Sequence, residues 1–265
     1  MIYSFIHPGS GLGNSLHRIV AGKVLALDKG LEYSAIGREN FKGKSFMDVD
    51  FGPSNDISYD TEMPAGKLVQ REGWNMTPLW EEKTNYYNPE FNFIEDNTII
   101  DGEFQDERYF EHRLKEIDEW LKIIPMEAEV REYGTDLCVI GFRGGEFYTV
   151  PELGLPQIYY EEGIVEMLKI NLKMRFEVHT DDLDLAHKFF PNHEVIHDIG
   201  INWRSMRYAK YAIIANSSFY ILPRLLKHHE AQGAITVGPR LWARRNLNNG
   251  VWSMPQNFYR SFHYI

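Results

Sequence analysis

Apolar runs and helical repeats alternate along most of this chain. Residues 2–6 form an apolar run that is typical of a strand, and Leu16, Ile19, Val24 and Leu27 then recur at helical spacing. The glycine-containing loop between these segments therefore joins a strand to a helix. This pattern predicts an opening βα unit of a nucleotide-binding-like layer.

The second half of the chain repeats the alternation more regularly. Strands that alternate with helices form a parallel sheet, and the ligands of such sheets bind at the carboxyl ends of the strands. This half is predicted to be a complete Rossmann-type domain with polar residues where its strands stop. The predicted strands lie at 136–142, 174–182, 193–198, 212–218 and 233–239, and the predicted helices at 159–172, 182–190, 205–211 and 219–228.

The part between these regions is less regular. Residues 40–97 are rich in Gly, Pro, Asn and aromatic residues with little periodicity, which predicts a long irregular region. A short strand is expected at 97–102, and a helix at 109–124, where apolar residues share one face. The expected fold class is α/β, with two Rossmann-type domains, 1–133 and 134–265, that face each other across a cleft.

Composition narrows the function classes. The 265 residues carry a formal net charge of −10, which disfavours wholesale binding to nucleic acid or anionic membranes. Residues 204–245 nevertheless hold eight Lys and Arg against one acid, which indicates either a local anion site or solvated helix faces. The single cysteine, Cys138, is expected to be buried because it lies in an apolar run. No apolar stretch approaches the roughly 20 residues that span a bilayer, and the start lacks signal-peptide features, so the expected location is the cytoplasm.

Gly9, Gly11 and Gly13 occupy the loop after the first predicted strand. Their G-x-G-x-G spacing does not match the dinucleotide-binding fingerprint, and no convincing acidic residue ends a second strand at the expected distance. These glycines therefore either clear space for a ligand or form a tight turn.

Arg143 follows a buried strand and is flanked by Gly141, Gly144 and Gly145. Glycines let a ligand approach the backbone closely, and a guanidinium is the group best suited to bidentate contact with a phosphate. The alternative interpretation is a strand-end turn in which Arg143 pairs with Glu146.

Asp181 and Asp182 end the next predicted strand. They can accept hydrogen bonds from a base or a ribose, or one of them can cap the helix that follows. Two adjacent carboxylates supply too few ligands for a metal, and no partner with metal-ligand spacing is visible, so no metal is expected.

Asn216, Ser217 and Ser218 end a third strand and open a helix. Their hydroxyl and backbone N–H groups would meet an anion at the positive end of that helix, although simple N-capping needs no ligand. Together the three clusters describe a nucleotide-diphosphate site at the ends of one parallel sheet.

Six segments extend this interpretation from Gly11 to Trp242: GLGNSL, DGEFQDERYF, IGFRGGEF, VHTDD, YAIIANSSF and VGPRLW. In this order they resemble bacterial α-1,2-fucosyltransferases of glycosyltransferase family 11. That family shows G-G-L-G-N-Q, G-[YF]-[FW]-Q-S-x-x-Y-F, H-I-R-R-G-D-Y, F-S-D-D, N-S-[ST]-F and P-x-x-W. The strongest part of the resemblance is DGEFQDERYF followed by ANSSF.

The resemblance implies a GT-B-like enzyme that binds GDP-fucose mainly in its second domain and uses no metal or other cofactor. Arg143 would contact the donor diphosphate, and Asp181 and Asp182 the guanosine. His7 would line the cleft from the first domain. The remaining positions implied for donor binding are Gly11, Gly13, Asn14, Asn216, Ser217, Ser218 and Phe219.

The chain departs from the family pattern at two motifs. Gly141 and Gly144 replace a histidine and the second arginine, and Glu146 replaces an aspartate. The aromatic segment keeps its glutamine as Gln105 but has Asp106 for the usual serine. Arg143 is therefore expected to carry the diphosphate with help from Arg204, Arg207 or Arg240.

The sequence thus predicts an inverting, metal-independent glycosyltransferase that moves L-fucose from GDP-fucose to a glycan hydroxyl. Arg143 and the helix start would stabilise the leaving diphosphate, and Glu146 or His7 would act as general base. The alternatives are a GT-B transferase that uses another nucleotide sugar and a catalytically weakened glycan- or nucleotide-binding relative. A Rossmann dehydrogenase is disfavoured by the missing fingerprint. Acceptor choice is expected in region 40–97, whose aromatics either stack on sugars or fill a core: Trp74, Trp80, Tyr86 and Tyr87.

Overall fold

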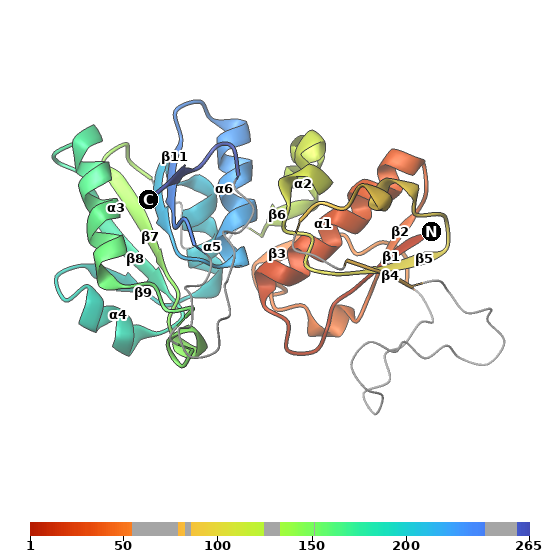
Figure 1. Cartoon of the computed structure of the whole chain (residues 1–265), viewed down its shortest axis with the longest axis horizontal. Coiled ribbons are helices and arrows are strands. Elements are labelled where there is room, and N and C mark those ends of the chain that lie inside the picture. Colours follow the sequence, from red (N-terminus) through yellow and green to blue (C-terminus); the bar gives the residue numbers. More distant parts are fainter. Residues whose placement is uncertain (55–78, 83–85, 125–132, 151, 242–258) are drawn as a thin grey trace. The chain divides into compact units, whose positions relative to one another are not determined.

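The computed structural model describes residues 1–54, 79–82, 86–124, 133–150, 152–241 and 259–265. The chain divides into two compact units, Met1–Ile124 (unit 1) and Pro125–Ile265 (unit 2) (Figure 1). The predicted domain boundary between residues 133 and 134 follows a stretch outside the described residues and stays a prediction.

Unit 1 is built on a parallel four-stranded sheet. The helix α1 (Leu12–Lys29) connects the first two strands and packs against the sheet, as the opening βα pattern predicts (Figure 1). Gly30 ends this helix in the left-handed conformation that favours glycine. The strand order is β2 (Tyr33–Ile36), β1 (Ile2–Phe5), β5 (Thr98–Asp101) and β4 (Leu79–Glu81).

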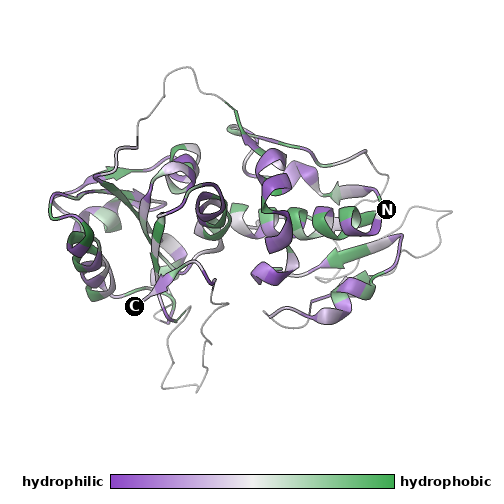
Figure 2. Cartoon of the chain, turned by 90° about the horizontal axis from the view of Figure 1, so that it is seen from above, coloured by the Kyte–Doolittle hydropathy of each residue, from purple (hydrophilic) through white to green (hydrophobic). Residues whose placement is uncertain are grey.

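The helix α1 carries both apolar and polar residues (Figure 2). Most of its residues are buried, whereas its spacing predicts only one apolar face. Polar side chains on it are therefore paired inside the unit. Lys23, for example, donates to Asp50 at 2.9 Å and lies 4.9 Å from the Trp120 ring.

The remaining elements of unit 1 differ from the prediction. The expected helix at 109–124 is wrong over most of its length, because Phe110 leaves the helical conformation at φ −150 and residues 121–123 form a strand. That strand pairs antiparallel with a segment inside the region predicted to be irregular. The elements are β3 (Met47–Val49), β6 (Leu121–Ile123), α2 (Leu114–Trp120) and the 3₁₀ helices η1 (Arg38–Asn40), η2 (Pro89–Phe93), η3 (Glu107–Tyr109) and η4 (Glu111–Arg113).

Several aromatic residues of region 40–97 pack against other rings, whereas Phe93 is 79% exposed. Trp80 stacks on Phe104 at 6.1 Å and meets Phe91 edge to face, so it fills a core. Tyr87 lies 4.9 Å from Tyr109. Trp74 lies outside the described residues.

Unit 2 contains a parallel six-stranded sheet. Cys138 is buried within it, as predicted. The helices α3 (Gln157–Ile170) and α4 (Leu183–Phe189) cover one face, and α5 (Ile199–Tyr208) and α6 (Ser218–Glu230) cover the other (Figure 1). The strand order is β12 (His263–Tyr264), β11 (Ile235–Gly238), β10 (Tyr211–Ile214), β7 (Leu137–Phe142), β8 (Arg175–Thr180) and β9 (Glu194–Ile196), and η5 (Gly145–Tyr148) follows β7.

Both sheets contain a point where the strand order reverses. In unit 2 the chain runs from β7 outward to β8 and β9, and then returns to β10 on the other side of β7. In unit 1 β1 has β2 on one side and β5 on the other. In open parallel sheets, ligands bind at the carboxyl ends of the strands beside such switch points. Within the described residues, no helix combines the length and apolar character that a membrane span requires.

Candidate functional site

The three polar clusters predicted in unit 2 leave the same edge of its sheet. The pairing of Phe142 with Thr180 and of Gly141 with Ile214 shows that β8, β7 and β10 end side by side. Arg143, Asp181 and the 216–218 turn therefore follow neighbouring strands. The Arg143 turn and the 216–218 turn flank the switch point between β7 and β10.

Arg143 is held between two carboxylates. Its Nη1 donates to Asp181, and its Nη2 donates to Glu146 at 2.9 Å. The guanidinium also lies 5.0 Å from the Phe147 ring centre. The side chain is 27% exposed and that of Glu146 is 76% exposed. The ion pair with Glu146, one of the two sequence interpretations, is therefore present, and Asp181 adds to it.

Two glycines around Arg143 are required by packing. A Cβ atom at Gly141 would lie 2.6 Å from the Tyr220 ring, and one at Gly144 would lie 2.4 Å from the Asp182 Cβ. Gly145 adopts a φ of +53, which side chains other than glycine rarely tolerate. These glycines thus let the turns after β7 and β8 approach each other and let α6 lie against β7.

The two aspartates that follow β8 bind backbone groups. Asp181 accepts from the Gly144 N–H at 2.8 Å, and Asp182 accepts from the Gly145 N–H at 2.9 Å. Asp182 also caps α4, because its other oxygen accepts from the Leu185 N–H at 3.0 Å. These hydrogen bonds lower the pKa of Asp182. The capping interpretation is confirmed for Asp182, whereas donor binding by either aspartate stays a prediction.

The 216–218 turn is buried in this structure. Asn216 donates from its side-chain amide to the Leu153 carbonyl at 2.9 Å. Ser217 caps α6 by accepting from the Phe219 N–H, so the capping interpretation is confirmed here too. Contacts between a donor and Asn216, Ser217, Ser218 or Phe219 stay predictions.

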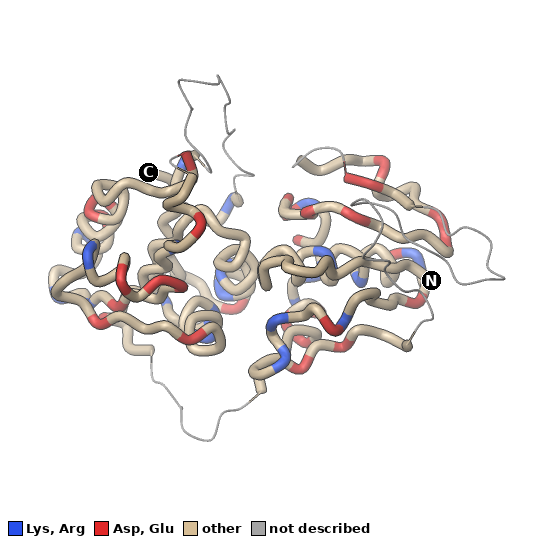
Figure 3. Tube along the Cα trace, turned by 90° about the horizontal axis from the view of Figure 1, so that it is seen from below, with Lys and Arg blue, Asp and Glu red and all other residues tan. Residues whose placement is uncertain are grey.

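Figure 3 marks the Lys and Arg residues of the chain, and two arginines of the basic segment 204–245 have partners inside unit 2. An anion site in this segment, and help for Arg143 from Arg204 or Arg240, stay predictions. Arg207 pairs with Glu230 at 2.6 Å, at the end of α6 opposite Ser218 and about 18 Å from it along the helix. Arg207 therefore does not assist Arg143, contrary to the expectation. Arg224 is fully buried and donates to Thr236 and to backbone carbonyls, and burial lowers its pKa to about 9.

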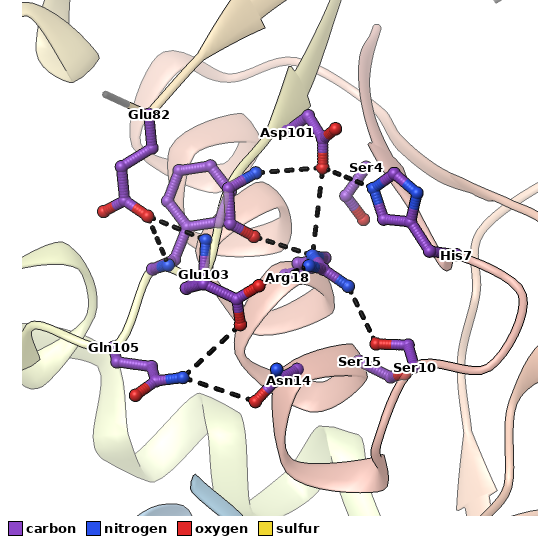
Figure 4. Close-up of polar contacts among 12 residues, drawn as sticks. Ser4, His7, Ser10, Asn14, Ser15, Arg18, Glu82, Asp101, Glu103 and Gln105 are labelled. Carbon is purple, nitrogen blue, oxygen red and sulfur yellow. Dashed lines mark hydrogen bonds and ion pairs between the residues drawn. The ribbon is translucent and has the colours of Figure 1, made fainter. Parts of the chain in front are cut away.

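Unit 1 places a second polar cluster at its own switch point (Figure 4). His7, which follows β1, makes a 2.7 Å hydrogen bond from Nε2 to Asp101 at the end of β5. Arg18 on α1 donates from Nε to the Gly102 carbonyl at 2.6 Å, from Nη1 to Ser10 at 2.9 Å and from Nη2 to Glu103 at 2.7 Å. Asn14 lies 3.3 Å from the Gln105 amide.

Sequence reasoning selected His7 and Asn14, and it named Gln105, which contacts Asn14. It gave no role to Asp101, which contacts His7, or to Arg18, which contacts Ser10 in the same loop. Asp101 and Glu103 lie in the DGEFQDERYF segment of the resemblance, and Asp101 also lies near the end of the strand predicted at 97–102. Arg18 lies outside the six segments of the resemblance. In the turn after β5, Glu82 accepts from the backbone N–H groups of Glu103 and Phe104 at 2.7 and 2.8 Å.

The glycines in the loop after β1 differ in whether the structure requires them. Gly9 has a φ of +77, so the tight-turn interpretation accounts for it. Gly11 has an ordinary φ of −66, and a Cβ atom there would meet nothing within 4 Å. The described structure therefore does not require glycine at position 11. The Gly13 carbonyl accepts from the buried His17 ring at 2.8 Å, and burial lowers the pKa of His17 to about 4.

No cluster of three or more His, Cys, Asp and Glu side chains suited to a metal ion occurs in the described part of the chain. The two switch points consequently offer different chemistry. In unit 2 a partly exposed guanidinium lies near a helix start, and in unit 1 a histidine is paired with a carboxylate.

Comparison with known proteins gives a likeness of fold. No protein-family model and no curated protein matches the sequence. The structure of fucosyltransferase NodZ from Bradyrhizobium matches at 15% identity with a TM-score of 0.50, over 85% of this chain and 92% of that chain. A structure of NodZ alpha-1,6-fucosyltransferase soaked with GDP-fucose matches at 15% identity with a TM-score of 0.49, over 85% and 91%. The first likeness confirms the α/β, GT-B-like fold class with Rossmann-type domains.

Proposed function

We propose that this protein is an inverting glycosyltransferase that transfers L-fucose from GDP-fucose to a hydroxyl group of a glycan, without a metal or other cofactor. One observation carries the proposal. Arg143 and the 216–218 turn leave neighbouring parallel strands at the switch point of the unit 2 sheet. Ligands of open α/β sheets bind at this position, and an arginine beside a helix start suits a diphosphate.

The motif order supports the choice of donor. The segments that resemble family 11 fucosyltransferases include Arg143, the Asp181–Asp182 pair and the 216–218 turn, which are the segments gathered at this edge. The NodZ fold likeness is compatible with the same donor but does not identify it. Acceptor identity and the linkage formed are left open by this proposal.

Two departures from the family motif have a structural reason. Gly141 and Gly144 stand where the family has a histidine and an arginine. Larger side chains at these positions would collide with Tyr220 and Asp182. Glycine at these two positions lets the turns pack closely. Arg143 is therefore the single arginine of this motif in the chain.

Donor binding changes the present contacts of two groups. Arg143 exchanges a carboxylate partner for the diphosphate, which costs little because exposed ion pairs contribute about 0–1 kcal/mol. The 216–218 turn is buried, so the groups that cover it, which include the Leu153 carbonyl on Asn216, move aside.

In the reaction, an acceptor hydroxyl attacks the anomeric carbon as the bond to the diphosphate breaks. Negative charge then accumulates on the departing GDP. Arg143 and the amides at the start of α6 stabilise that charge, an effect typically worth 10²- to 10³-fold in rate for one such donor.

Nucleotide protection tests the donor assignment. Thermal unfolding of the full chain is followed with GDP, UDP and ADP. A ligand at 100 times its Kd stabilises the folded state by about 2.7 kcal/mol. We expect GDP to raise the melting temperature and the other two nucleotides to have little effect. If UDP stabilises the protein and GDP does not, the donor is a UDP-sugar and not GDP-fucose. If no nucleotide stabilises the protein, the proposal is wrong.

A matched pair of variants locates the donor site. We expect Arg143→Ala to lower the transfer rate by about 10²- to 10³-fold. Arg175→Ala is the control, because Arg175 begins β8 at the opposite edge of the same sheet and makes a comparable exposed ion pair with Asp136. Equal losses in both variants would contradict the assignment.

The second candidate is a catalytically weakened nucleotide-binding relative, which the two replaced motif residues favour. It predicts that GDP protects the chain while GDP-fucose is neither transferred nor hydrolysed. Measurable turnover in the wild type that disappears in Arg143→Ala excludes this candidate.

A further inference from the structure

Arg143 holds two carboxylates that the fold anchors to different degrees. Asp181 directly follows β8, and both of its oxygens have partners inside unit 2. Oδ1 accepts from the Gly144 N–H at 2.8 Å, and Oδ2 accepts from Arg143 Nη1. This carboxylate is therefore part of the contact between the turns after β7 and β8.

Glu146 is anchored through its backbone. It lies in η5, where its carbonyl accepts from the Thr149 N–H at 3.1 Å and from the Thr149 hydroxyl at 2.7 Å. Its side chain is 76% exposed, against 36% for Asp181. In the part of the chain that the structure describes, Arg143 Nη2 at 2.9 Å is the one hydrogen-bond donor to its carboxylate. A long exposed side chain of this kind gains rotamer freedom when its single contact is released.

The guanidinium has other contacts that keep it in place. Nη1 remains on Asp181, and the group lies 5.0 Å from the centre of the Phe147 ring. Releasing Glu146 therefore frees Nη2 alone. A phosphate oxygen is an anionic acceptor like a carboxylate oxygen, and it binds a guanidinium N–H at about 2.7–2.9 Å. Oε1 of Glu146, at 2.9 Å from Nη2, occupies the position that such an oxygen would take.

The hydrogen-bonded group around Arg143 carries more negative than positive charge. It contains the carboxylates of Asp181, Asp182 and Glu146 and the guanidinium of Arg143. Carboxylates that stay in place repel an incoming diphosphate. Asp181 and Asp182 accept from backbone N–H groups, whereas Glu146 loses only its contact with Nη2 when it moves away. Glu146 is therefore the carboxylate that an anion displaces most readily.

We infer that Glu146 competes with the diphosphate for Arg143 Nη2, whereas Asp181 stays bound to Nη1 throughout. This inference rests on the proposed function and specifies what controls the affinity of that site. The Glu146 carboxylate leaves Nη2 when the diphosphate binds and returns when GDP dissociates. Glu146 thus weakens the binding of donor and product alike, and its return promotes the release of GDP. This role is distinct from that of the general base predicted from the sequence.

Calorimetric titration with GDP and with inorganic pyrophosphate tests the competition. Glu146→Gln keeps the length of the side chain and removes its charge. We expect this variant of the full chain to bind both anions about two- to fivefold more tightly than the wild type, which corresponds to the contribution of an exposed ion pair. Its melting temperature without ligand should stay close to that of the wild type, since the ion pair is exposed. In transfer assays, its KM for GDP-fucose should fall by a similar factor.

Two variants serve as matched controls. Glu166→Gln removes the same charge from another i,i+3 ion pair of unit 2, that of Glu166 with Lys169 at 2.5 Å in the second half of α3. It should leave both affinities unchanged. Asp181→Asn should tighten binding less than Glu146→Gln does, because it also removes the fixed partner of Arg143 Nη1.

The inference is wrong if Glu146→Gln binds both anions no more tightly than the wild type, or if either control gains as much affinity. It is also wrong if neither anion binds to the wild type or to Glu146→Gln. A fall in kcat with no gain in affinity would identify Glu146 as the general base instead. Failure of the proposed function looks different. Pyrophosphate then still binds more tightly to Glu146→Gln, while GDP binds no better than pyrophosphate and GDP-fucose is not transferred.

Discussion

The two switch points of this protein each contain an arginine, and the two arginines differ in burial and in their partners. Arg18 in unit 1 comes from a helix, is almost fully buried, and donates from all three of its nitrogens to the surrounding loops. Arg143 in unit 2 comes from a strand end, is partly exposed, and faces two carboxylates of which Glu146 is largely open to solvent.

The difference shows that burial, and not residue type or topology, decides how readily an arginine exchanges its protein partners for an anion. Removing a buried guanidinium leaves its acceptors unpaired away from water, which is costly. An exposed ion pair can be replaced by water or by an anion at small cost. A diphosphate can therefore recruit Arg143, whereas recruiting Arg18 would dismantle the loops of unit 1.

Stability measurements on the two arginines probe this comparison most strongly. We expect Arg18→Ala to lower the free energy of unfolding by about 3 kcal/mol, because Gly102, Ser10 and Glu103 lose their donor. Arg143→Ala should lower it by less than about 1 kcal/mol. Denaturant titration of both variants measures the two values, and similar losses would show that the contrast is wrong.

The glycine loops give a smaller contrast. Gly144→Ser should destabilise the protein by about 1–3 kcal/mol, since its Cβ would lie 2.4 Å from that of Asp182. Gly11→Ser should change stability by less than about 0.5 kcal/mol, because position 11 is the N-cap of α1 and has open space. Thermal unfolding of the two variants compares them. A large loss in Gly11→Ser would reveal a structural need for glycine in unit 1.

The smallest expected effect concerns pH. Backbone hydrogen bonds from Leu185 and Gly145 lower the pKa of Asp182 in the folded state. The folded protein therefore binds this proton less readily than the unfolded chain, so the stability contributed by Asp182 is present above its ordinary pKa of about 3.9. It is lost as pH falls through the lower folded value. We expect Asp182→Asn to weaken the decline of melting temperature in acid, and an unaltered decline would contradict this role.

The regular half of the fold was predictable from local pattern. The strands β7 to β11 of unit 2 overlap the five segments predicted for them, although β10 begins at Tyr211, one residue before its predicted segment. The helix α5 begins six residues earlier than predicted because Asp198 caps it through the Ile201 N–H. Asp198 lies at the end of the strand predicted at 193–198, so its role as a helix cap was not recognised from the sequence.

Unit 1 was harder because its elements are short and depend on distant partners. Residues 121–123 read as the end of a helix, but pairing with β3 makes them a strand. The predicted segment at 109–124 keeps helical spacing over α2 only. Short segments of this kind have weak intrinsic preferences, so tertiary contacts decide their conformation.

The residues of the candidate site also differ in how far the sequence identifies them. Arg143 and the 216–218 turn are recognisable because each follows a strand and belongs to a motif. The contacts of Asp101 and Arg18 are not recognisable, although Asp101 belongs to the DGEFQDERYF motif. The contact between His7 and Asp101 joins residues 94 positions apart, and that between Arg18 and Gly102 joins residues 84 apart. No local pattern encodes such pairings.

Local sequence alone specifies the alternation of strands and helices, the polar residues at strand ends and the glycines beside them, because these depend on neighbours a few positions away. Tertiary structure decides which of those residues share an edge, which arginine is buried, and which histidine faces a carboxylate. Those properties arise from parallel pairing of strands far apart in the chain, which sets both the distances between side chains and their access to water.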